Sequence, residues 1–189
     1  HPVDPPAPTR PPRRATTPVL YKRCGASGLK LPASIAGLLA QLRRHHALRP
    51  DEGLVLTAFD HGITHFDLAN NYGPEPGAAE KNAGRLIRQY LAAHRDELVI
   101  STKAGYEMWS GPYGDWGSRK YLLASLDQSL ERLGLDYVDI FYHHRPGPRD
   151  SFGGNDGRAR PGRRQRQGAL CGLSNYDGPQ LERAATILE

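Results

Sequence analysis

The chain has 189 residues and a net charge of +5, and it contains two cysteines, Cys24 and Cys171. That length allows one hydrophobic core, although a (β/α)8 barrel usually takes about 250 residues, and the sequence lacks both a long apolar stretch and an apolar N-terminal signal. We therefore expect a cytoplasmic protein that does not enter a membrane, and the two cysteines provide neither a disulfide framework nor a metal site.

Two segments supply the positive charge. Residues 145–168 hold seven arginines against two aspartates, and residues 1–17 hold three arginines against one aspartate. The remaining chain is slightly acidic, so a basic face for nucleic acid is not expected. Residues 1–18, which are rich in Pro and Arg, are predicted to form a disordered tail ahead of a domain at 19–189.

Regular elements are predicted from residue 19 onward. Residues 19–32 favour a hairpin of two short strands around a Gly-Ala-Ser-Gly turn. Helices and strands then alternate: helix 50–61, strand 64–69, helix 77–95, strand 98–103, a helix from the Ser118 cap to Gly134, strand 137–143, strand 169–173 and helix 179–188. Such alternation predicts parallel strands joined by right-handed crossovers, so the predicted fold class is α/β.

Polar side chains follow the predicted strands at their C-terminal ends, which form the working face of α/β folds. They are, in chain order, Asp67 and Tyr72 of the segment THFDLANNYG (64–73), then Lys103, then His143 and His144. A phenol titrates at about 10, but a nearby ammonium lowers its pKa, so Lys103 can tune Tyr72 as a proton donor. Asp67 can hold the lysine in position and keep its ammonium charged. A histidine can hydrogen-bond a substrate carbonyl.

Three segments resemble strand motifs of the aldo-keto reductases, a family of (β/α)8 barrels that use NADPH. They are residues 66–73 (FDLANNYG), 101–105 (STKAG) and 139–146 (DIFYHHRP), which are similar to the motifs of that family's second, third and fourth strands and stand in the same order. Taken singly, each polar residue has an ordinary structural explanation. The three ordered motifs together favour membership of the family.

The resemblance implies a role for each residue of the cluster. Tyr72 would be the general acid, and Lys103 would tune it. Asp67 would pair with Lys103 and contact the nicotinamide ribose, and His144 would orient the substrate carbonyl. The implied cofactor-binding residues are Asp67, His144, Ser174 and Asn175, the last two against the nicotinamide carboxamide.

Two loops resemble one group within the family. Residues 73–77 (GPEPG) and 106–109 (YEMW) look like the group that contains the L-glyceraldehyde 3-phosphate reductases and is related to the potassium-channel β subunits. The resemblance implies the reduction of a small aldehyde, L-glyceraldehyde 3-phosphate or a related one, with NADPH. Channel β subunits tend to have Asn where His144 stands, so the histidine favours an enzyme.

Other readings stay open on the sequence. A regulatory subunit resembling the channel β subunits would bind NADPH with little turnover, and the Gly- and Arg-rich residues 153–166 could bind RNA. The aromatic residues of the loop after Lys103 either line the substrate mouth or only pack the loop; they are Tyr106, Trp109, Tyr113 and Trp116. Oligomerisation stays open as well.

Two stretches depart from the family pattern, residues 34–45 and 147–170. Codons for Trp-His-Asn-Phe-Gly, shifted by one base, can encode the Leu-Ala-Gln-Leu-Arg of residues 39–43, and codons for Leu-Glu-Glu-Thr-Met can similarly give residues 152–157. We hypothesise two compensated frameshifts. We also expect an incomplete barrel of about five strand-helix units, with the C-terminal three of the eight units missing.

Overall fold

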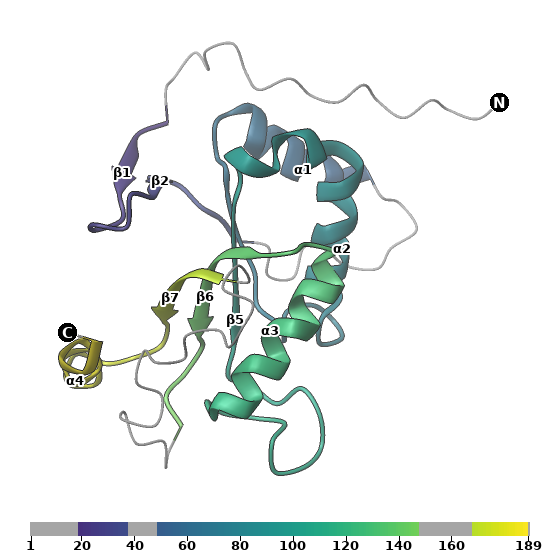
Figure 1. Ribbon diagram of the computed structural model, residues 1–189. Helices are drawn as coiled ribbons and strands as arrows, with labels where there is room; N and C mark the ends of the chain where they lie inside the picture. Colours follow the sequence, from purple (N-terminus) through teal and green to yellow (C-terminus); the bar gives the residue numbers. More distant parts are fainter. Residues whose placement is uncertain (1–18, 38–48, 148–167, 189) are drawn as a thin grey trace.

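The computed structural model describes residues 19–37, 49–147 and 168–188 (Figure 1). The predicted tail at 1–18, the Gly- and Arg-rich residues 153–166 and most of the two anomalous stretches therefore lie outside the described residues.

Five parallel strands form the main sheet, in the order β3-β4-β5-β6-β7. Their bounds are Ala36–Gly37, His65–Asp67, Val99–Ala104, Val138–His143 and Gly168–Leu173. Each strand pairs with the next one along the chain, as expected of strands joined by crossover connections. The predicted α/β class is confirmed, whereas the incomplete barrel stays a prediction. The short β3 lies in the first anomalous stretch, where the sequence pattern predicts no element.

A separate hairpin precedes the sheet. Strands β1 (Tyr21–Arg23) and β2 (Lys30–Pro32) pair antiparallel, which confirms the predicted hairpin. The Tyr21 hydroxyl donates a hydrogen bond to the carbonyl of Gly62 at 2.7 Å. This bond ties the hairpin to the turn that leads into β4.

The helices follow the predicted order. They are α1 (Arg49–Asp60), α2 (Ala78–Leu86), α3 (Arg119–Leu133) and α4 (Gly178–Leu188). At the start of α3 the Ser118 hydroxyl accepts a hydrogen bond from the Tyr121 amide, and Gly134 ends the helix with φ 66°, so both predicted caps are confirmed. None of the helices in the described part of the chain is long and apolar enough to cross a bilayer.

The prediction of a single helix at 77–95 is wrong, because the structure divides this stretch into three segments. After α2 the chain passes through a π-helical turn, η1 (Ile87–Leu91), and a 3-10 segment, η2 (Ala92–Glu97). The wider π turn adds a residue to the turn, and Ile87, Tyr90 and Leu91 are all buried there. A regular α-helical pattern read from the sequence does not anticipate this extra residue.

The core lies between one face of the sheet and the helices α2 and α3, which run along that face in Figure 1. Phe66 of β4 and Ile100 of β5 pack there against Leu86 and Leu133. Because successive side chains of a strand point to opposite faces, the residues next to Phe66 and Ile100 turn away from these helices. The polar cluster is built on that opposite face.

Candidate active site

The predicted polar residues meet at one edge of the sheet. Asp67 ends β4, Lys103 stands one residue before the end of β5, and His144 directly follows β6. Neighbouring parallel strands end at the same edge, and β5 lies between β4 and β6. The structure therefore brings together residues that are up to 77 positions apart in the chain, from Asp67 to His144.

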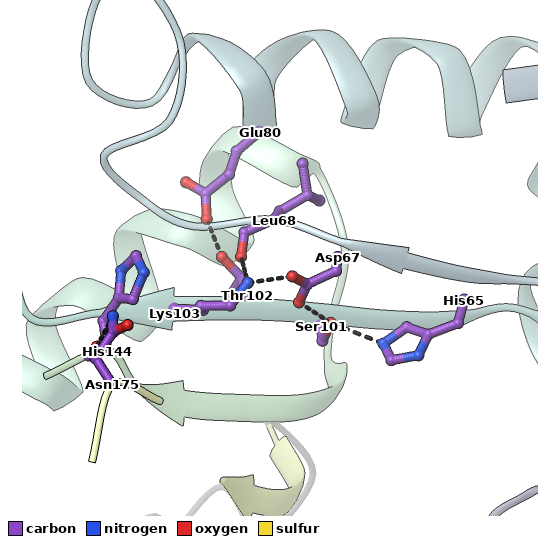
Figure 2. Close-up of polar contacts among 9 residues, drawn as sticks. All are labelled: His65, Asp67, Leu68, Glu80, Ser101, Thr102, Lys103, His144 and Asn175. Atoms are coloured by element: carbon purple, nitrogen blue, oxygen red, sulfur yellow. Dashed lines mark hydrogen bonds and ion pairs between the residues drawn. The ribbon is translucent and has the colours of Figure 1, made fainter. Parts of the chain in front are cut away.

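Asp67 and Lys103 form an ion pair at the centre of the site (Figure 2). The Lys103 ammonium donates to Asp67 Oδ2 and, at 2.8 Å, to the Leu68 carbonyl. The other oxygen of Asp67, Oδ1, accepts a 2.6 Å hydrogen bond from the Ser101 hydroxyl. Lys103 is only 7% exposed. Burial lowers the pKa of Lys103, and Asp67 acts against that shift by favouring the charged ammonium.

Tyr72 stands beside the lysine in the loop after β4. The Lys103 nitrogen lies 5.3 Å from the centre of the Tyr72 ring. The pKa of Tyr72 is raised above its ordinary value, first by burial and then by the negative charge of Asp67 and by Tyr106. The phenol therefore holds its proton at neutral pH. The shift is opposite in direction to the lowering by Lys103 that the sequence predicts, and tuning of the Tyr72 pKa by Lys103 stays a prediction.

His144 is packed edge-on between two phenol rings. Its ring centre lies 5.7 Å from that of Tyr72 and 4.8 Å from that of Tyr106. Burial and then the positive charge of Lys103 lower the pKa of His144 to about 4. The imidazole is therefore neutral at pH 7, with one nitrogen that donates and one that accepts. Its Nδ1 is buried and has no hydrogen-bond partner among the described residues.

The two adjacent histidines are separated by the structure. His143 Nδ1 lies 2.6 Å from the Tyr176 hydroxyl, and the two rings are in edge contact. His143 is thereby directed toward the segment after β7, while His144 faces Tyr72. The assignment of His144, rather than His143, to the catalytic cluster stays a prediction.

Ser174 and Asn175 follow β7 and lie against the end of β6. The Ser174 amide donates to the His143 carbonyl, and the Asn175 side-chain amide donates to the His144 carbonyl, both at 2.9 Å. Figure 2 shows Asn175 directly beside His144. Asn175 adopts a left-handed conformation with φ 57°, which Asn tolerates better than most residues. The contact of both residues with a nicotinamide carboxamide stays a prediction.

The aromatic residues of the loop after β5 divide into two pairs. The guanidinium carbon of Arg145 lies 4.2 Å from the ring centre of Tyr106 and 3.8 Å from that of Trp116. Trp109 packs on a tyrosine of α3, and Tyr113 is 50% exposed. Of the four residues, Tyr106 also touches His144. The aromatic residues therefore pack the loop against its neighbours, and Tyr106 also contacts the candidate active site at His144.

Sequence reasoning missed two contributors to this site, Arg145 and Ser101. Arg145 pairs with Asp115 at 2.8 Å and donates to the Gly105 carbonyl at 2.7 Å, so it ties the loop to the end of β6. Ser101 carries a usable signal, because it stands two residues before Lys103 and must face the same side of β5. Arg145 stands in the DIFYHHRP motif, but its contacts depend on how the loop folds back, which no local pattern predicts.

Comparison with known proteins adds an independent line of argument. Residues 42–187 match the sequence model of the aldo/keto reductase family. The chain is 66% identical over 125 residues to an L-glyceraldehyde 3-phosphate reductase of Escherichia coli K12, an alignment that covers 66% of this chain and 36% of the relative. It is 38% identical over 128 residues to a probable voltage-gated potassium channel subunit beta of Arabidopsis thaliana, covering 67% of this chain and 37% of the relative.

A solved structure has a similar fold. The crystal structure of a thermostable aldo-keto reductase in complex with the inhibitor epalrestat superimposes with a TM-score of 0.71 and 30% sequence identity, covering 89% of this chain and 58% of that one. The chain thus spans a little over a third of the length of the curated relatives it matches, 36% and 37%.

Proposed function

Because the chain belongs to the aldo/keto reductase family, we propose that it is an NADPH-dependent oxidoreductase that reduces a small aldehyde. The observation that carries the proposal is the cluster of Asp67, Tyr72, Lys103 and His144 at one edge of the sheet. In this cluster a proton-holding phenol lies near both a buried ammonium and a neutral imidazole. That combination suits proton delivery to a carbonyl oxygen.

The residues at this edge fit a nicotinamide nucleotide. Lys103 uses two of its three N–H donors within the protein, on Asp67 and Leu68, and has one left. Two further buried polar atoms, Asn71 Oδ1 and His144 Nδ1, have no hydrogen-bond partner within the described part of the chain. The hydroxyl groups of a ribose and the amide of a nicotinamide could satisfy such groups. Asp67, His144, Ser174 and Asn175 would hold that end of the cofactor.

The proposed mechanism assigns one task to each residue. NADPH, when bound, supplies the hydride for the carbonyl carbon. Tyr72 gives its proton to the carbonyl oxygen, and the ammonium of Lys103 stabilises the phenolate that remains. Asp67 keeps that ammonium charged, and neutral His144 donates a hydrogen bond that holds the carbonyl in place. A positioned acid of this kind contributes typically ~10² to 10⁴ in rate.

The substrate class is argued from the relatives. The 66% identical relative is named an L-glyceraldehyde 3-phosphate reductase, so this compound or a related small aldehyde is the proposed substrate. A cytoplasmic location belongs to the same proposal. A second function, an NADPH-binding regulatory subunit, is favoured by the 38% identity to a probable channel β subunit. The two proposals differ in turnover, because only the enzyme needs Tyr72 as an acid.

The test combines NADPH binding, measured by nucleotide fluorescence, with glyceraldehyde turnover. Tyr72→Phe removes the proton donor and keeps the ring, so we expect kcat to fall by about 100-fold or more while NADPH binding is retained. Tyr113→Phe is the matched control, because Tyr113 is half exposed and its ring contacts the Lys120 ammonium.

Three outcomes separate the proposals. Turnover that depends on Tyr72 and not on Tyr113 supports the reductase. Tight NADPH binding without turnover in the unmodified chain favours the regulatory subunit. Failure to bind NADPH contradicts both.

A further inference from the structure

Two buried polar residues continue the cluster deeper into the sheet. His65 is 1% exposed and Ser101 is wholly buried. They stand two residues before Asp67 and Lys103, so they occupy the same face of β4 and β5. In barrels of parallel strands such inward positions are usually filled by bulky apolar residues. Two polar side chains there require an explanation.

These residues form a hydrogen-bonded chain that ends on the ion pair. His65 Nε2 lies 2.9 Å from Ser101 Oγ, and Ser101 Oγ lies 2.6 Å from Asp67 Oδ1. Figure 2 shows the row His65, Ser101, Asp67 and Lys103 along β5, with His144 beyond the lysine. These hydrogen bonds thus reach the Asp67–Lys103 ion pair from earlier positions on β4 and β5.

The direction of each hydrogen bond follows from counting protons. Ser101 has a single hydroxyl proton. If Ser101 donated this proton to His65, its oxygen lone pairs would face the Asp67 carboxylate at 2.6 Å, and the two oxygens would repel each other. A distance of 2.6 Å is instead typical of a hydroxyl that donates to a carboxylate. Ser101 therefore donates to Asp67, and His65 must carry its proton on Nε2.

The other nitrogen of His65 agrees with this assignment. Nδ1 is buried and has no hydrogen-bond partner among the described residues, so a proton there would be an unsatisfied donor. Burial lowers the pKa of His65, and nearby Lys103 lowers it further, against the opposing effects of Asp67 and Asp139. His65 is therefore neutral, with the proton on Nε2 alone.

We propose that His65 and Ser101 are positioning residues, which fix the Asp67 carboxylate so that Oδ2 faces the Lys103 ammonium. The proposal rests on the reductase function proposed above. With Oδ1 held by Ser101, the carboxylate cannot rotate away from the lysine. The lysine in turn keeps two N–H groups on Asp67 and Leu68, which leaves its third N–H for a bound molecule. His65 polarises the Ser101 hydroxyl and fixes its rotamer.

Kinetics of matched variants test this role. His65→Leu removes the donor and fills the space, whereas His65→Gln keeps an N–H near the position of Nε2. We expect His65→Leu and Ser101→Ala to lower kcat by about 10- to 100-fold with little change in KM, because misplacement of the acid's partner affects the chemical step. We expect His65→Gln to retain most of the activity. Ser125→Ala is the control, since Ser125 is equally buried but lies on α3.

Nuclear magnetic resonance gives a readout that does not need turnover. The ¹⁵N spectrum should show His65 protonated on Nε2 and bare on Nδ1. The Lys103 ammonium should give its own ¹⁵N resonance, because hydrogen bonds slow its proton exchange, and this resonance should persist in His65→Gln and broaden away in Ser101→Ala and His65→Leu.

A proton on Nδ1 of His65, or an unchanged lysine resonance and kcat in Ser101→Ala, would overturn the proposal. If the unmodified chain shows no turnover, the reductase function fails, while the lysine resonance still decides whether the chain of bonds positions Lys103.

Discussion

His144 illustrates how the surroundings of one residue set its chemical state. The imidazole is buried beside two phenol rings, and a nearby ammonium disfavours a second positive charge. The result is a histidine that stays neutral through the physiological range and can serve as a hydrogen-bond donor rather than as an acid. Tyr72, whose pKa is shifted upward, then remains the proton donor of the cluster.

The pKa of His144 predicts how stability depends on pH. The folded protein protonates this residue only near pH 4, whereas the unfolded chain does so near the ordinary value of 6.5. Between these values the unfolded state binds more protons, so the free energy of unfolding falls as pH drops from about 6.5 to 4. The effect of this one group is at most roughly 3 kcal/mol.

Urea denaturation at pH 7 and pH 4.5 checks this prediction. We expect His144→Gln to lose less stability than the unmodified chain over that interval, because glutamine does not titrate. His61→Gln, at an exposed position of the turn after α1, should behave like the unmodified chain. Identical pH dependence of the unmodified chain and His144→Gln would show that this histidine titrates normally in the folded state.

At the level of helices and strands, Glu80 joins three elements. This glutamate of α2 is wholly buried, and it accepts hydrogen bonds of 2.6 Å from Thr102 of β5 and from Arg132 of α3. Thr102 adjoins Lys103 on the opposite face of β5, toward the helices (Figure 2). The helix-facing side of β5 is therefore held by Glu80, while its other side carries the site.

Substitution of Arg132 tests how much its ion pair with Glu80 contributes to the free energy of unfolding. Arg132→Met leaves a buried carboxylate without its cation, and we expect a loss of about 3 to 5 kcal/mol in the free energy of unfolding. Arg85→Met is the matched comparison, because the Arg85–Glu52 pair is partly exposed, at 34% and 18%, and should cost about 1 kcal/mol or less. Urea titration measures the free energy of unfolding of both variants. Equal losses in Arg132→Met and Arg85→Met would contradict this prediction.

The elements also show what sequence can predict and what it cannot. The hairpin, the caps of α3 and the strands that carry Asp67 and Lys103 follow from local patterns, because turn residues and hydrophobic periodicity act over a few positions. The bond between His65 and Ser101 depends on the pairing register of β4 and β5, which no local pattern sets. The short β3 and the π turn of η1 were missed for the same reason: packing against the rest of the fold overrides local preference.

At the scale of the whole molecule, the outer strands of the sheet bear on whether the protein self-associates. Within the described residues, β3 and β7 each pair on one side only. Strand β7 has six residues, Gly168–Leu173, and among them Cys171 is exposed. Unpaired backbone groups along an outer strand can pair with another chain, so we predict that this polypeptide self-associates as its concentration rises.

A charged residue on the outer strand should reduce that association. Cys171→Lys places a charge on β7, where pairing with a second strand would bring two such charges together and bury them. Ala185→Lys adds the same charge on an exposed position of α4 and should leave association unchanged. Light scattering coupled to size-exclusion chromatography, over a range of concentrations, measures the effect. A monomeric unmodified chain with a cooperative thermal transition at every concentration would contradict the prediction of self-association.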